Sequence, residues 1–89
     1  MKLYLIHCGF YDSELCGGIY EGHINLFIAA KDFEEAKAKV RLEPEFKKKK
    51  MHVDGLQEIE LVNGFRVQMV PDQMRSDQTI LNSNRHRDL

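Results

Sequence analysis

Two short patterns in the sequence place a carboxylate and an imidazole at a spacing that suits chemistry. They are Glu21-x-His23 and His52-x-Asp54. If each pair lies on a β-strand, its two side chains point to the same face, because residues two apart share a face. A carboxylate beside an imidazole fixes the tautomer of the ring, which suits a general base or a metal ligand.

The two pairs together predict a candidate metal site. If the second strand and the segment around His52 lie side by side, the four residues form a compact two-histidine, two-carboxylate cluster. Such a cluster could bind a divalent metal and leave positions open for water, or serve a small hydrolase-like enzyme. Two alternatives stay open. Asp54-Gly55 could form a turn with His52 hydrogen-bonded locally, or the polar residues could be ordinary cross-strand pairs on an exposed face.

The basic run Lys47–Lys50 is the other conspicuous feature, since clustered lysines can contact phosphates. Acidic residues flank the run at Glu43, Glu45 and Asp54, and Phe46 is the only aromatic residue beside it. The chain as a whole has 13 basic and 14 acidic residues and a net charge of -1, so no global field steers it toward nucleic acid. A solvated loop is the favoured interpretation, and nucleic-acid binding is the weakest of three functional hypotheses.

The two cysteines, Cys8 and Cys16, form no C-x-x-C pair and are expected to be free thiols. We expect Cys8 in the core and Cys16, before Gly17-Gly18, to be exposed and sensitive to oxidation. The sequence holds no phosphate-binding loop and no G-x-S-x-G motif. These absences favour a protein that is not an enzyme, with no cofactor beyond a divalent metal.

Length and composition indicate one ordinary globular domain. The chain has 89 residues, of which 43% are hydrophobic and 30% charged. No apolar run approaches the ~20 residues that a membrane span needs. The opening "MKLYLIHC" is too short for a signal peptide and is expected to form the first strand, so the cytoplasm is the expected location.

Two strands are predicted in the first third of the chain. Residues 2–8 are apolar on both faces, which is typical of a central strand covered on both sides. A loop is expected over residues 9–18, between glycines. Residues 19–30 form the second strand, with its polar residues on one face.

A helix is predicted over residues 31–46. Asp32 is a good N-cap, and Glu35 completes a capping box. Pro44 should end the regular helix near Leu42. The apolar stripe of this helix consists of Phe33, Ala36 and Val40.

A β-hairpin is predicted over residues 56–70, because Asn63-Gly64 is a strong hairpin signal. A three-residue loop, Val62-Asn63-Gly64, separates apolar from charged residues on the two faces, with Gly64 in a G1 bulge. The expected pairs are Leu61 with Phe65, Ile59 with Val67, and Glu60 with Arg66. Pairing of Glu60 with Val67 would contradict this register. Pro71 should end the last strand.

The resulting order is β-β-α-β-β, an α+β two-layer domain with one helix on a four-stranded, mostly antiparallel sheet. The domain is expected to span residues 1–71, followed by a polar tail over residues 72–89. One helix cannot cover both faces of such a sheet. We therefore expect the uncovered face, or a sheet edge, to pack on a second copy of the chain, and association as a homodimer is the leading functional hypothesis.

The sequence resembles the small bacterial domain-of-unknown-function family numbered 1543. The resemblance rests on "KLYLIHCGF", a glycine-containing loop, "IYEGHINLFIAA", the short helix, "MHVDG" and "LVNGFRVQMV", and covers roughly residues 2–70. That family has no assigned activity and occurs as one or two domains per chain, which implies that single copies pair. The family pattern resembles E-x-H and H-x-D at Glu21/His23 and His52/Asp54. The loop "GFYDSELCGG" departs from the family's compact version, so the resemblance assigns it no role.

Overall fold

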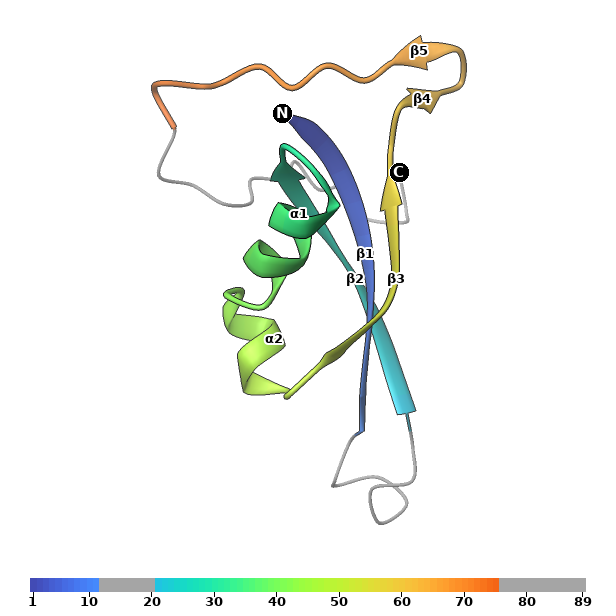
Figure 1. Ribbon diagram of the computed structural model, residues 1–89, viewed down its shortest axis with the longest axis vertical. Coiled ribbons are helices and arrows are strands. Elements are labelled where there is room, and N and C mark those ends of the chain that lie inside the picture. The colour runs from blue at the N-terminus through green and yellow to red at the C-terminus, as the bar shows by residue number, and fades with distance from the viewer. Residues whose placement is uncertain (12–20, 76–89) are drawn as a thin grey trace, which may run out of the picture.

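A computed structural model describes residues 1–11 and 21–75 of the chain. Its elements, in order, are β1 Lys2–Tyr11, β2 Glu21–Ala30, α1 Phe33–Val40, α2 Pro44–Lys48, β3 His52–Glu58, β4 Leu61–Val62 and β5 Phe65–Arg66 (Figure 1). The predicted α+β class is confirmed, and all the strand pairings are antiparallel. The predicted single four-stranded sheet is wrong in detail, because three strands form one sheet in the order β2-β1-β3 and β4-β5 form a separate ribbon.

Strand β1 is the central strand, as its apolar character on both faces predicts. Tyr4, Ile6 and Cys8 are fully buried on the helix side. The sequence predicted that this strand ends at Cys8. Instead, the strand continues to Tyr11 in register with β2. Residues 9–11, which were predicted to lie in a loop, therefore belong to the sheet.

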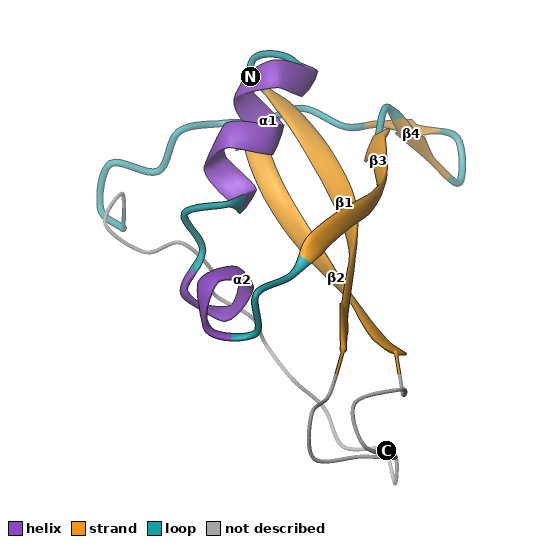
Figure 2. Ribbon diagram, turned by 60° about the horizontal axis from the view of Figure 1, so that its bottom comes forward, coloured by secondary structure: helices purple, strands orange, loops and turns teal. Residues whose placement is uncertain are grey.

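The hydrophobic core lies between the sheet and the helices, which occupy the same face (Figure 2). Helix α1 packs mainly on β2 and also on β1. The buried core residues are Tyr4, Ile6, Cys8, Ile28, Ala30, Ala36, Val40 and Met51. The opposite face of the sheet carries no helix in the part of the chain that the structure describes.

The predicted start of α1 is confirmed. The Asp32 side chain accepts a 2.8 Å hydrogen bond from the backbone N–H of Glu35. The Glu35 carboxylate accepts from the N–H of Lys31, and this bond and the neighbouring Lys39 ammonium hold its pKa below the usual value. The helix ends at Val40, somewhat earlier than predicted.

A second helix, α2, was not predicted. It begins at Pro44, because proline suits the first turn of a helix, where its missing N–H would be unpaired anyway. The run of lysines is therefore not a simple loop: Lys47 and Lys48 end α2, and Lys50 has a positive φ of 50°.

The predicted hairpin register is wrong. Leu61 pairs with Arg66, and the N–H of Val67 donates to the carbonyl of Glu60. The loop therefore has two residues, Asn63 and Gly64, with φ of 51° and 82°, as a type I′ turn requires.

The ribbon leaves the sheet because its partner strand ends. The N–H of Ile59 still donates to the carbonyl of Leu3, but β1 begins at Lys2. Within residues 1–11 and 21–75, no strand remains beside the residues that follow, so β4 and β5 pair only with each other. Strand β5 also ends at Arg66, well before Pro71.

The last described residues form a turn rather than a strand. Asp72 accepts the N–H of Met74 and makes a 2.8 Å ion pair with Arg75. Neither helix in the described ranges is long and apolar enough to cross a membrane.

Candidate metal site

The four predicted site residues converge on the open face of the sheet, but not through neighbouring strands. Glu21 and His23 lie on β2 and His52 and Asp54 on β3, with β1 between them. The strand order was left open by the sequence, and the two strands that carry the pairs do not lie side by side. Two strand spacings place their backbones about 10 Å apart, so the side chains can meet only over the middle strand.

Gly9 of β1 is the reason that they meet. It pairs with His23 on one side and with His52 on the other. A Cβ atom at Gly9 would lie 2.4 Å from Asp54 Oδ2, 2.6 Å from His52 Nε2 and 3.0 Å from Glu21 Oε1. Because Gly9 has no side chain, the polar groups of Asp54, His52 and Glu21 can occupy the space above its backbone.

A β-bulge adds Asp54 to the cluster. Cys8 pairs with Val53 and His7 pairs with Gly55, so Asp54 is the extra residue between them. The alternative that Asp54-Gly55 forms a turn is wrong, since both residues lie within β3. The bulge lets Val53 on one side of it and Leu56 on the other both pack against the core, while Asp54 points to the open face.

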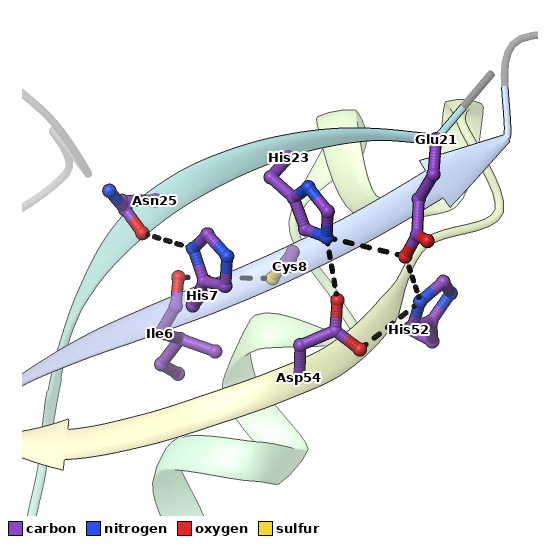
Figure 3. A network of polar contacts seen from close by, with 8 residues as sticks. All are labelled: Ile6, His7, Cys8, Glu21, His23, Asn25, His52 and Asp54. Carbon is purple, nitrogen blue, oxygen red and sulfur yellow. Dashed lines mark hydrogen bonds and ion pairs between the residues drawn. The ribbon is translucent and has the colours of Figure 1, made fainter.

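The contacts link the four side chains in a closed ring, which passes through both oxygens of the Asp54 carboxylate (Figure 3). His23 Nε2 lies 3.3 Å from Glu21 Oε1 and 3.2 Å from Asp54 Oδ2. His52 Nε2 lies 3.4 Å from the same Glu21 oxygen and 3.2 Å from Asp54 Oδ1. These distances exceed the about 2.7–2.9 Å of a charge-assisted hydrogen bond. They are comparable to the separation of about 3.3–3.4 Å between two neighbouring ligands of one ion with bonds of about 2.0–2.1 Å.

The charge of the cluster also suits a cation. Among the described residues, the two histidines are the only ion-pair partners of the Glu21 and Asp54 carboxylates. Glu21, His52 and Asp54 each offer a ligand atom within 4.8 Å of the others, and His23 contacts both carboxylates from β2. A divalent ion would neutralise the two carboxylates. Since the four side chains are about one-third to just under one-half exposed, water can reach the ion.

Two residues that the sequence did not single out support the His23 ring. The His7 ring stacks on it, with centroids 4.8 Å apart and planes 6° apart. His7 Nδ1 lies 2.8 Å from the side-chain oxygen of Asn25, which accepts a hydrogen bond in the tautomer that carries its proton on Nδ1. This contact fixes the His7 ring, and the stacking then orients His23.

Gly9 is the third residue that sequence analysis missed. A signal existed, because an isolated glycine within a strand pattern often marks a close approach. Gly9 was instead predicted to begin a loop, because the residues that follow it are typical of loops.

The remaining chemical candidates lie outside this cluster. Cys8 is buried on the core side as a free thiol, as predicted, and burial, followed by the charge of Asp54, raises its pKa. Lys49 makes a 3.0 Å ion pair with Glu45 and lies over the Phe10 ring. Cys16, the predicted redox-sensitive residue, lies outside the described residues.

Comparison of the chain with protein-family models, curated proteins and solved structures gives no significant match in any of the three.

Proposed function

We propose that the protein binds a divalent transition-metal ion through Glu21, His23, His52 and Asp54. The observation that carries the proposal is the ring of four N···O contacts of 3.2–3.4 Å above Gly9. Glu21, His52 and Asp54 supply ligand atoms within 4.8 Å of one another, and His23 contacts both carboxylates, so the four side chains converge as the ligands of one ion would.

The donor set indicates the kind of metal. Imidazole nitrogen suits zinc, iron, nickel and copper, whereas magnesium and calcium prefer sites built from oxygen alone. We therefore expect the order of affinity Zn²⁺ well above Mn²⁺, and no binding of Mg²⁺ at comparable concentration. A bound ion with a water ligand would lower the pKa of that water, which is the chemistry that the hydrolase-like alternative would require.

Isothermal titration calorimetry with Zn²⁺, together with metal analysis of the purified protein, tests the proposal. Wild-type protein should bind one equivalent, and the His23→Ala/His52→Ala variant should not. His86→Ala removes a histidine that is outside the proposed cluster and should leave binding unchanged. Equal binding by the wild-type protein and the double variant would show that Zn²⁺ binds elsewhere, and no binding by either would end the proposal.

Homodimer formation is the second proposed function, and one observation favours it. On the open face, the cluster is followed along the strands by apolar residues, including the directly paired Leu5 and Phe27. Phe27 is 59% exposed, and the β4-β5 ribbon exposes Val62 and Phe65 as well. Sedimentation equilibrium should show a dimer that Phe27→Lys dissociates. A monomer at high protein concentration would contradict this.

The cytoplasm remains the expected location, because a free thiol such as that of Cys8 persists in a reducing compartment. The resemblance to the family numbered 1543 likewise stays a prediction.

A further inference from the structure

A groove of about 650 Å³ runs beside β3, and His52 and Asp54 of the candidate metal site are among its lining residues. One wall is the unbroken run of residues 51–56, and the other is formed by Lys37, Arg41 and Phe46 of the two helices. Side chains of a strand alternate between its faces. A wall built from consecutive residues therefore means that the groove follows the backbone edge of the strand.

That backbone edge is unpaired in the described part of the chain. Strand β3 lies at the margin of the sheet and pairs only with β1. Its outward N–H and C=O groups are available to a further strand, which is how extended peptides add to exposed sheet edges.

The helix wall of the groove carries two positively charged side chains that form no ion pair with the described residues. Lys37 lies in α1, and Arg41, the C-cap residue of that helix, follows four positions later on the same side. Neither forms an ion pair with any residue in the described ranges, whereas Lys39 and Lys49 nearby are both paired. The Asp54 carboxylate also belongs to a groove-lining residue, but it is engaged with the histidines.

The apolar lining shows which kind of segment fits. Phe46, Val53 and Leu56 line the groove and are only partly buried, because α1 packs on β2 and β1. A strand with apolar side chains on one face would cover them. Carboxylates on that strand would meet Lys37 and Arg41.

We propose that this groove binds an extended acidic peptide segment of another protein, added to β3 as a further strand. Its backbone pairs with the β3 edge, its carboxylates contact Lys37 and Arg41, and its apolar side chains cover Val53 and Leu56. His52 and Asp54 line the groove as well as the metal site, but the proposed peptide contacts are made by other groups.

Fluorescence anisotropy with labelled ten-residue peptides tests the proposal. A peptide of alternating glutamate and valine should bind saturably, and one of alternating lysine and valine should not. The acidic peptide should lose binding when the backbone nitrogens along one edge are methylated. Lys37→Gln/Arg41→Gln should weaken binding about tenfold, since exposed ionic contacts contribute up to about 1 kcal/mol each.

A matched variant controls for net charge. Lys47→Gln/Lys48→Gln removes the same charge from exposed residues outside the groove and should change binding less than about twofold. Lys37→Glu/Arg41→Glu should transfer binding to the basic peptide.

Three outcomes would overturn the proposal. The first is equal binding of acidic and basic peptides, and the second is equal weakening by the two glutamine variants. The third is a dimer of the chain alone that Lys37→Gln/Arg41→Gln dissociates, which would make a second copy the occupant.

Discussion

Replacement of Gly9 by alanine should separate metal binding from folding. The new Cβ would lie 2.4 Å from Asp54 Oδ2 and 2.6 Å from His52 Nε2. Ordinary contact requires about 3.5 Å, so each group must retreat by about 1 Å. Coordination bonds tolerate about 0.2 Å. Asp54 and His52 are therefore lost as ligands, and Glu21, whose Oε1 would lie 3.0 Å from the new Cβ, must shift as well. The Zn²⁺ affinity should fall at least about 100-fold, which exceeds the effect of most changes outside the ligand set.

The same substitution should leave the fold intact. The atoms in the way are the ends of flexible, partly exposed side chains, which can turn toward water. The backbone of Gly9 lies in a regular strand without positive φ. Alanine there restricts the unfolded chain, so metal-free Gly9→Ala should be as stable as the wild-type protein or more stable by up to about 1 kcal/mol.

Calorimetric titration with Zn²⁺ and urea unfolding without metal measure the two effects separately. Gly55→Ala is the matched control, because its Cβ would meet only His7 Cβ at 3.5 Å, an ordinary contact. It should retain Zn²⁺ binding. If Gly9→Ala binds Zn²⁺ as tightly as Gly55→Ala, the space above Gly9 is not the metal site.

Three further predictions concern the stability of the fold that carries the site. Tyr4→Phe should leave the Tm unchanged or raise it, because the Tyr4 hydroxyl is buried without a hydrogen-bond partner among the described residues; a clear fall in Tm would reveal a missing partner. Asp32→Ala should cost about 1 kcal/mol of unfolding free energy through loss of the α1 cap, and an unchanged urea midpoint would contradict the role of that bond. Burial, followed by the charge of Asp54, raises the pKa of the Cys8 thiol above the ordinary 9.0. The folded protein then keeps this proton where the unfolded chain releases it, so stability is full below about pH 9 and falls above it. Cys8→Ala should flatten that alkaline fall in urea titrations, and an unchanged slope would refute this cause.

Local patterns predicted those parts of the fold that local physics decides. The apolar character of residues 2–8 on both faces identified the central strand, and Asp32 with Glu35 identified the start of α1. The hairpin register failed for a physical reason. Separating apolar from charged faces matters only when one face is buried, and the exposed ribbon buries neither. The preference of Asn63-Gly64 for a two-residue turn therefore decides the register.

The sequence predicted which residues form the candidate site, but not how the strands bring them together. Residue types and spacing selected Glu21, His23, His52 and Asp54. Their meeting depends on strand order and on Gly9, and strand order follows from contacts distant in sequence. A short-range pattern could not show that a third strand lies between the two pairs.

The bulge at Asp54 has a consequence for insertions and deletions in this strand. Removing one residue from a strand normally turns every later side chain to the wrong face. Here, removing Asp54 would leave Val53 opposite Cys8 and Gly55 opposite His7, which is the regular antiparallel ladder. A single-codon deletion would thus remove one carboxylate and keep the core pairings. Conversely, a single inserted codon would be enough to add this carboxylate to an otherwise regular sheet.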